Sequence, residues 1–267
     1  MIPYKFLLIL IFCNTLYSFN EKPLKTEFYA FANAMPALNY EQQAQLLKKL
    51  GYSGISQVFQ AGDKLTRQVE VYKKYKLKVL SIYLQATEKP IDMNSIKALG
   101  NGGMIELTVH KINPQIIESI RQTSERAKKL NIRVALYPHH GFAVATIPQA
   151  LELVNKVNHP NLGLMFNLCH FLKNEDINDL ENILIKAKDK LFSVSINGAD
   201  IDGKDWKTLI QSLDKGSFPQ TRLISALKDI EFTGPISLQG FGIKGDKSIN
   251  LENSMKRWKA ISHELKD

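Results

Sequence analysis

Most histidines of this chain are placed where they could share one site. Four of the six follow runs of apolar residues that are typical of buried strands, and these four are His110, His139, His140 and His170. His159 and His263 fall instead in a predicted loop and in a terminal helix. Histidine changes its charge near neutral pH and its ring nitrogens bind metals, so it suits proton transfer or metal ligation. We therefore expect one shared site, with His139 and His170 as the candidate catalytic residues.

Polar side chains, most of them uncharged, follow the same apolar runs. They are Asn33, Gln57, Gln85, Tyr137, Asn167, Asn197 and Gln239, with Asp200 shortly after Asn197. An amide offers both donors and acceptors, which suits the hydroxyl groups of a sugar. We predict that the substrate is bound by Tyr137, His140, Asn167, Asn197, Asp200, Gln239 and His110.

Three further features could carry chemistry, and each also has a plainer interpretation. Cys169 precedes His170, but neighbouring residues at a strand end point apart, which argues against a Cys–His nucleophile. Glu106 lies inside a predicted strand, either as a buried acid of the interior or as the partner of a lysine, and the sequence leaves both open. The glycines of 240–245 could hold a phosphate through backbone N–H groups, although ordinary turns explain them more simply.

The elements that must position these residues alternate between strand and helix. Strands are predicted over 28–32, 53–59, 77–84, 104–109, 132–137, 162–166, 191–196 and 235–238. Helices are predicted over 40–50, 64–75, 92–99, 114–130, 147–157, 177–188, 206–213, 221–230 and 251–265. Such alternation implies parallel strands joined by right-handed crossovers. Repeated units over ~240 residues predict an α/β fold, a (β/α)8 TIM barrel with its active site at the carboxyl ends of the strands. The alternative is a doubly wound open sheet, but no GxGxxG follows the first strand.

The first 18 residues have the pattern of a secretory signal peptide. Lys5 precedes an apolar run over 6–13, which is too short to span a bilayer. We therefore expect residues 19–267 to form a single exported domain, secreted or periplasmic, with an uncleaved anchor as the alternative. Cleavage would leave Cys169 as the only cysteine, so we expect no disulfide within the chain. No second apolar run of this kind follows, and we expect no stable membrane insertion once the signal is removed.

Composition and charge exclude several classes of protein. Hydrophobic residues make up 44% of the 267 residues and charged residues 23%, which excludes a largely disordered chain and a fibrous rod. The net charge of +9 is spread along the chain in single lysines and pairs. A nucleic-acid-binding protein more often shows a basic run with stacking aromatics. We expect a small-molecule partner and no nucleic acid.

Part of the sequence resembles a known superfamily. The segment 134–171 reads VALYPHHGFAVATIPQALELVNKVNHPNLGLMFNLCHF, the segment 195–200 reads SINGAD, and the segment 232–246 reads FTGPISLQGFGIKGD. These segments resemble the fifth to eighth strand ends of the xylose isomerase-like TIM-barrel superfamily. The likeness is greatest to its exported members of the sugar-phosphate isomerase/epimerase type. The resemblance implies a TIM barrel and a carbohydrate substrate.

The resemblance also implies a divalent metal, whose ligands this chain lacks. The superfamily commonly carries a Glu, the Asp of Asp-x-x-His, the His of His-x-x-Asp and a Glu at four strand ends. The matching residues here are Tyr137, Asn167, Asn197 and Gln239. A hard cation needs anionic oxygen ligands, so we predict no tight metal at these positions. A different metal site on His139, His140 and His170 stays open, and the sequence leaves the cofactor undetermined.

These observations favour a sugar isomerase- or epimerase-like protein. It would remove a proton next to a carbonyl of a carbohydrate or polyol, which leads to isomerisation, epimerisation or dehydration. Export argues against a phosphorylated sugar. The alternative is a non-catalytic carbohydrate-binding protein on a degenerate isomerase scaffold. DNA repair, which the superfamily also includes, fits poorly with export and with the absence of the ligands.

Overall fold

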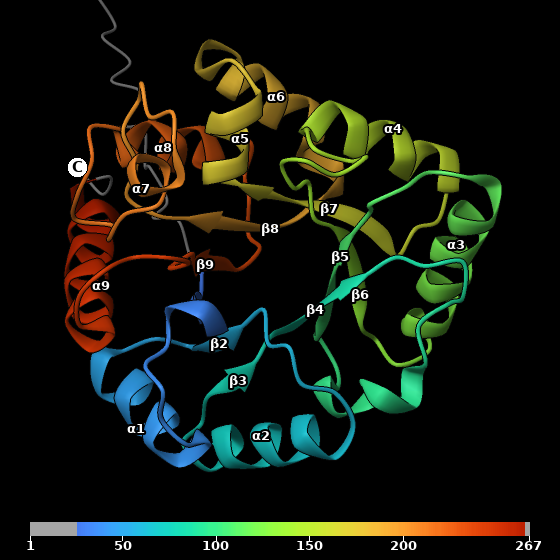
Figure 1. Cartoon of the computed structure of the whole chain (residues 1–267), viewed down its shortest axis with the longest axis horizontal. Helices are drawn as coiled ribbons and strands as arrows, with labels where there is room; N and C mark the ends of the chain where they lie inside the picture. The colour runs from blue at the N-terminus through green and yellow to red at the C-terminus, as the bar shows by residue number, and fades with distance from the viewer. Residues whose placement is uncertain (1–25, 265–267) are drawn as a thin grey trace, which may run out of the picture.

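Short buried strands pair in parallel and curve into a ring that helices surround (Figure 1). This computed structural model describes residues 26–264. The predicted TIM barrel is confirmed. The predicted signal peptide, residues 1–18, lies outside the described residues.

Nine strands make up the ring within the described residues. They are β1 (Phe28–Phe31), β2 (Gly54–Ser56), β3 (Lys78–Val79), β4 (Ser81–Gln85), β5 (Met104–Thr108), β6 (Arg133–Leu136), β7 (Leu162–Asn167), β8 (Leu191–Ile196) and β9 (Ile236–Leu238). The order around the sheet is β3-β2-β1-β9-β8-β7-β6-β5-β4. The two end strands, β3 and β4, follow each other in the chain with only Leu80 between them. A parallel bridge between Val58 and Ile82 links the two ends. This closure excludes the open-sheet alternative.

The helices lie on the outside of the ring (Figure 1). They are α1 (Tyr40–Leu50), α2 (Gly62–Lys74), α3 (Pro114–Lys128), α4 (Ile147–Val157), α5 (Leu168–Asn174), α6 (Leu180–Ala187), α7 (Trp206–Leu209), α8 (Gln220–Asp229) and α9 (Lys247–Glu264). Their boundaries follow local signals. Asn39 and Gln42 form a capping box at the start of α1, which ends at the left-handed Gly51. Thr146 and Gln149 form the same box at the start of α4.

Most of the buried apolar side chains fill two regions of the barrel. The larger core lies between the strands and the helices and includes Leu47, Ile82, Val134 and Leu223. A smaller cluster contains Phe31, Met104, Ala135, Tyr137 and Met165. Alternate residues of a strand point to opposite faces, so one face packs on helices while the other fills the barrel. The cluster on this second face closes the barrel beneath the strand ends.

The structure corrects the predicted elements in several places. The strand predicted over 77–84 is divided into β3 and β4. The helix predicted over 92–99 is two 3-10 turns, η2 (Met93–Ser95) and η3 (Lys97–Leu99). Helix α7 ends at Leu209, four residues before the predicted end. Helix α5 was not predicted, and it begins directly after β7 because the side chain of Asn167 caps it by accepting from the His170 N–H.

Candidate active site

A cavity of about 390 Å³ opens at the carboxyl ends of the strands. Its lining residues come from seven different segments that follow or form strand ends. They are Asn33, Gln57, Phe59, Tyr83, Tyr137, His139, His140, His170, Trp206, Ile210, Gln239 and Phe241. Among these described residues there is no lysine, arginine or carboxylate. The cavity therefore presents amides, imidazoles and aromatic rings.

Two histidines of the cavity lie against each other. The ring centroids of His139 and His170 are 4.1 Å apart. The Nδ1 atom of His139 is 2.8 Å from the carbonyl oxygen of His140, which can only accept, so this nitrogen carries the proton. The Nδ1 atom of His170 accepts from the backbone N–H of His140 at 3.3 Å. In the neutral rings, His139 therefore has its lone pair on Nε2, and His170 has its proton on Nε2.

Burial keeps both rings uncharged. Burial, together with the smaller effects of the neighbouring His139 and His140, lowers the pKa of His170 to about 3. Burial also lowers the pKa of His139, although its hydrogen bond to the His140 carbonyl opposes this shift. Near neutral pH the pair consists of one acceptor nitrogen and one donor nitrogen at a single site. Such a pair can take up a proton at one atom and donate a hydrogen bond from the other.

Three amides form a connected relay on the other side of the cavity. The Oε1 atom of Gln239 accepts from Asn33 Nδ2 at 2.7 Å and from the backbone N–H groups of Gly240 and Phe241 at 3.0 and 3.1 Å. Asn33 Nδ2 also lies 3.4 Å from Gln57 Oε1. A side chain at Gly240 would place its Cβ 2.5 Å from the Cβ of Ala34, so only glycine allows these two loops to approach. The relay is therefore fixed by close contact between the chain after β1 and the chain after β9.

Glu106 lies beneath the cavity, and the structure decides between its two interpretations. Its side chain is buried in the barrel interior, with 1% exposure, and its oxygens accept from Ser81 Oγ at 2.6 Å and from Gln57 Nε2 at 3.0 Å. Its hydrogen-bond partners are these two neutral groups rather than a lysine. Burial raises the pKa of this carboxyl to about 7, although both hydrogen bonds lower it.

The four positions matched to metal ligands are not equivalent in the structure. Tyr137 and Gln239 line the cavity. Asn167 lies behind Tyr137, to whose hydroxyl its Nδ2 donates at 2.6 Å. Asn197 is turned away, because its Nδ2 donates to the carbonyl oxygens of Gly198 and Leu209, both at 2.7 Å. The expected convergence of all four side chains is therefore corrected for Asn197, which holds the following loop instead.

The residues present do not fit a divalent metal. The Gln239 oxygen is occupied by three N–H donors, and the Asn167 Oδ1 accepts from Cys169 Sγ at 2.9 Å and from the His170 N–H at 3.5 Å. Over residues 26–264 no three His, Cys, Asp or Glu side chains gather as ligands, and His139, His140 and His170 do not form such a group. We derive no step of the chemistry through a metal.

Besides Asn167 and Asn197, two further predicted binding residues lie outside the cavity lining. Asp200 accepts from Gln211 Nε2 at 3.0 Å and from the Ser217 N–H at 3.1 Å, so it ties together the loop that follows β8. His110 is exposed and stacks on Phe142 with centroids 3.6 Å apart. Phe142 in turn stacks on His139 at 4.3 Å. Neither side chain is among the residues that line this cavity, and direct substrate binding by Asp200 and His110 stays a prediction.

Sequence reasoning missed the aromatic rim of the cavity. Phe59 and Phe241 are 54% and 61% exposed there, and Trp206 is 37% exposed. Phe59 and Phe241 each stand two residues after a lining glutamine, the spacing that returns a side chain to the same face of a strand. That spacing was a usable signal. Trp206 comes from α7 after a long loop, and no local pattern indicated it.

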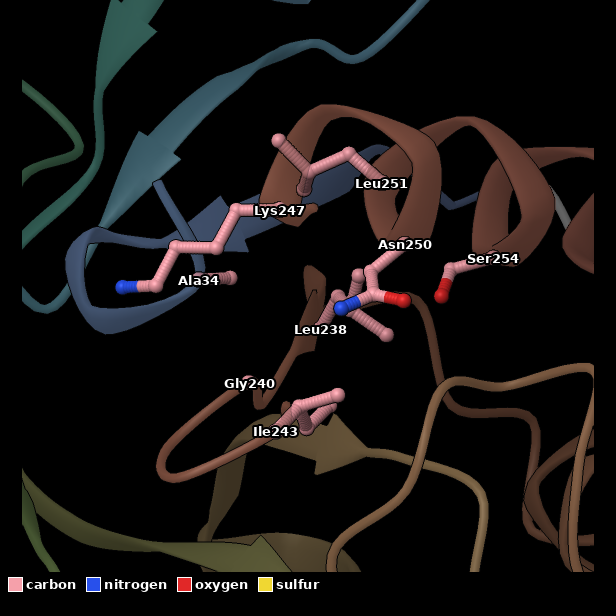
Figure 2. A pocket seen from close by; sticks show the side chains of 8 residues that line it. All are labelled: Ala34, Leu238, Gly240, Ile243, Lys247, Asn250, Leu251 and Ser254. Atoms are coloured by element: carbon pink, nitrogen blue, oxygen red, sulfur yellow. The ribbon is translucent and has the colours of Figure 1, made fainter. Parts of the chain in front are cut away.

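A second, much smaller cavity lies between α9 and the end of β9 (Figure 2). Asn250 and Ser254 point from α9 toward its centre (Figure 2), but its volume of about 10 Å³ has room for about one water. The nearby glycine run 240–245 leads to a helix start where Asp246 accepts from the Ser248 N–H at 2.7 Å. Because the chain's own carboxylate occupies this helix start, the turn interpretation of these glycines fits and a phosphate site does not.

Cys169 is a structural residue in this arrangement. Its side chain is buried, and burial raises the pKa of the thiol well above its ordinary value, which opposes formation of a thiolate nucleophile. We expect Cys169→Ser to retain at least about a third of any sugar turnover or binding, because a hydroxyl can keep the hydrogen bond to Asn167. Turnover and circular dichroism of the purified variant check this. A loss of several powers of ten in a folded variant would restore the nucleophile.

Comparisons with known proteins agree with the fold. A family model described as xylose isomerase-like TIM barrel matches residues 106–261. A probable ketose 3-epimerase of Synechocystis sp. is 24% identical over 155 residues, which are 56% of this chain and 48% of that protein. The chain therefore spans about half the length of this curated relative.

Solved structures share the whole fold. A D-allulose 3-epimerase from Methylomonas sp., in complex with D-allulose, has a TM-score of 0.67 and 16% identity over 89% of this chain and 98% of that one. A xylose isomerase domain protein from Alicyclobacillus acidocaldarius has a TM-score of 0.70 and 15% identity over 91% and 100% of the two chains. At these identities the likeness concerns the fold. Within residues 26–264, no helix is both long and apolar enough to cross a bilayer.

Proposed function

The chain belongs to the xylose isomerase-like TIM-barrel family, and we propose that it is a sugar isomerase- or epimerase-like protein acting on a neutral ketose. The relative named as a probable ketose 3-epimerase and the structure holding D-allulose support this class of substrate. The observation that carries the proposal is the pair of adjacent neutral histidines with opposite tautomers, His139 and His170.

The proposed chemistry is one proton transfer beside a carbonyl. His139 Nε2 takes the proton from the carbon next to the carbonyl, and the electrons of that C–H bond form the double bond of an enediolate. His170 donates from Nε2 to the oxygen on which negative charge develops. The His140 carbonyl oxygen, 2.8 Å from His139 Nδ1, stabilises the imidazolium that forms. Return of the proton from His139 to the former carbonyl carbon, with transfer of the neighbouring hydroxyl proton to the other oxygen, gives an isomer. Protonation of the original carbon from the opposite face by water, with His139 losing its proton to solvent, gives an epimer.

The lining supports a neutral carbohydrate rather than a phosphorylated one. The described lining residues include no lysine or arginine that would pair with a phosphate. Asn33, Gln57 and Gln239 offer amide groups to hydroxyls. Phe59, Trp206 and Phe241 offer apolar faces on which the C–H face of a sugar ring can pack. This combination of a polar interior and an aromatic rim is the chemistry of a sugar pocket.

Deuterium exchange tests the proposal directly. The protein is incubated with D-allulose and with its C3 epimer D-fructose in D2O, and proton NMR follows loss of the C–H signals next to the carbonyl. We expect exchange in at least one of these ketoses together with formation of an isomer or epimer. Absence of both exchange and binding across a panel of neutral ketohexoses and ketopentoses would refute the proposal.

A second candidate is a non-catalytic carbohydrate-binding protein. It is favoured by the neutral residues Tyr137, Asn167, Asn197 and Gln239 at the family's ligand positions. The same experiment separates the two functions. A thermal shift with a ketose, without any deuterium exchange, would establish a binder and exclude the enzyme.

We also propose that the protein is exported, to a secreted or periplasmic location, because residues 1–18 have the pattern of a signal peptide. A neutral sugar is a suitable substrate outside the cytosol. Amino-terminal sequencing of protein from the native host should find a mature chain beginning near Phe19. Recovery of the full-length chain in a membrane fraction would contradict export by cleavage.

A further inference from the structure

A carboxyl group without a cation lies directly below the proposed sugar site. Glu106 is 1% exposed and is held by Ser81 from β4 and by Gln57 from the chain after β2. The titratable groups that face it across the barrel are the phenols of Tyr83 and Tyr137, and burial, helped by the charge of Glu106, raises the pKa of both. Neither phenol supplies positive charge, so among residues 26–264 only hydrogen bonds are seen to stabilise a charge on Glu106. A buried acid in this position requires an explanation beyond packing.

Glu106 and Ser81 together fix the conformation of Gln57. The backbone N–H of Gln57 donates to Ser81 Oγ at 2.8 Å, and Ser81 Oγ donates to Glu106 Oε1 at 2.6 Å. Gln57 adopts a φ of 52°, which is in the left-handed region that a non-glycine residue rarely occupies. Such strain persists only where surrounding contacts determine the conformation. The carboxyl thus holds a strained residue at the floor of the cavity.

The same contacts set the direction of the Gln57 amide, while the Gly240 N–H, which donates to Asn33 Oδ1 at 3.1 Å and to Gln239 Oε1 at 3.0 Å, fixes the other two amides of the relay. A carboxylate only accepts, so Gln57 must turn its Nε2 toward Glu106 and its Oε1 toward Asn33. Asn33 then donates to the oxygens of Gln57 and Gln239. Because the Gln239 oxygen faces Asn33 and the backbone of its own loop, the Nε2 of Gln239 is left as the donor for a ligand in the cavity.

We propose that Glu106 is a positioning residue whose ionisation sets the hydrogen-bonding direction of Gln57 in the amide relay that binds the sugar, so that proton uptake weakens sugar binding. This inference rests on the proposed carbohydrate function. Protonation converts one oxygen of Glu106 from acceptor to donor, which allows Gln57 to rotate its amide by half a turn. Gln57 Nε2 would then face Asn33 Nδ2, two donors that cannot pair. The pKa of about 7 puts this change near neutral pH.

Glu106→Gln tests the proposal because glutamine has the shape of the carboxyl and mimics its protonated form. With D-allulose as the probe, titration calorimetry between pH 5.5 and 8.5 should show wild-type affinity falling as the pH decreases through about 7. In Glu106→Gln the affinity should be ~10-fold weaker than in the wild type at pH 8, which is the cost of one misdirected hydrogen bond. The affinity of this variant should not change as the pH passes through about 7. Unchanged affinity and an unchanged pH profile would overturn the proposal.

Glu175→Gln is the matched control. Glu175 is also a partly buried carboxyl whose pKa burial raises to about 7, but it accepts from the Ile147 N–H at the start of α4 and does not line the cavity. This variant should keep the wild-type pH profile of sugar binding. His140 lines the cavity and is unchanged in both variants, so the comparison isolates the two carboxyl groups.

A measurement without sugar separates this proposal from the proposed function. The side-chain amide signals of Gln57, Asn33 and Gln239 in 15N NMR spectra should titrate with a common midpoint near pH 7 in the wild type and in Glu175→Gln. In Glu106→Gln these amide signals should show no transition near pH 7. If these signals titrate but no ketose binds, the proposed carbohydrate function is wrong, whereas the link between the ionisation of Glu106 and the orientation of the amides is confirmed. If they titrate identically in Glu106→Gln, the proposal is wrong whatever the ligand.

Discussion

His139→Gln should lower the rate of deuterium exchange next to the ketose carbonyl by about 10²–10⁴-fold, the usual contribution of a positioned acid or base. His139 is the histidine whose Nδ1 proton is held by the His140 carbonyl at 2.8 Å, which leaves Nε2 free to accept a proton in the cavity. Glutamine preserves hydrogen bonding but cannot act as a base at neutral pH. Proton NMR in D2O measures the exchange rate, and calorimetry checks that sugar affinity changes by less than about tenfold.

His159→Gln provides the control for this experiment. His159 lies outside the cavity lining, where its Nε2 lies 3.1 Å from Glu125 Oε2. The control variant should exchange at the wild-type rate. Because burial lowers the pKa of His139, its base form persists as the pH falls through 6.5, and exchange at saturating sugar should not decline there. Exchange at the full rate in folded His139→Gln would show that the base is another residue.

The double variant Asn167→Asp with Gln239→Glu should be strongly destabilised at neutral pH. Both side chains are buried, with exposures of 2% and 4%, and no lysine or arginine appears among the described residues that line the adjacent cavity. Two carboxyls placed there must either ionise without a cation or take up protons. Their pKa values should rise on folding, so the lost stability, roughly 2–4 kcal/mol for each site, should appear as the pH rises from 5 to 8. Urea unfolding at several pH values measures it.

Added Mn²⁺ shows whether the two new carboxylates of the double variant form a metal site or only add buried charge. If the two carboxylates converge, Mn²⁺ should raise the melting temperature of the double variant through binding linkage and leave the wild type unchanged. A control with the exposed changes Asn178→Asp and Gln115→Glu has the same net charge and should show neither effect. Tight stoichiometric metal in the wild type would contradict the metal-free site. Absence of both destabilisation and metal response in the double variant would contradict the placement of these side chains.

The alternation of elements in the chain was sufficient to predict the fold. Apolar runs such as 162–166 and amphipathic segments such as 114–130 have local periods that each element needs. Sequential parallel strands with right-handed crossovers then leave few topologies. The boundaries differed where an element lacks a strong local signal. The turns η2 and η3 replaced a helix, and α5 began one residue after β7 because Asn167 caps it.

The sequence also located part of the site, because strand ends in a parallel barrel face one rim. Tyr137, His139, His140, His170 and Gln239 were predicted on that ground and line the cavity. Their residue types indicated a sugar site with neutral groups, and the substitution of the four expected ligands was visible without a structure.

Only the tertiary structure decided which way each side chain turns once its strand has ended. Asn197 and Asp200 stand at a strand end like Gln239, but contacts with Leu209 and Gln211 in a distant part of the loop direct them away from the cavity. The tautomers of His139 and His170 depend on the backbone of His140, and the role of Glu106 depends on Gln57 across the ring. The periodicity of the sequence predicts which face of a helix or strand a residue occupies. The orientations of these side chains beyond the strand ends are instead set by hydrogen bonds between segments that lie far apart in the chain.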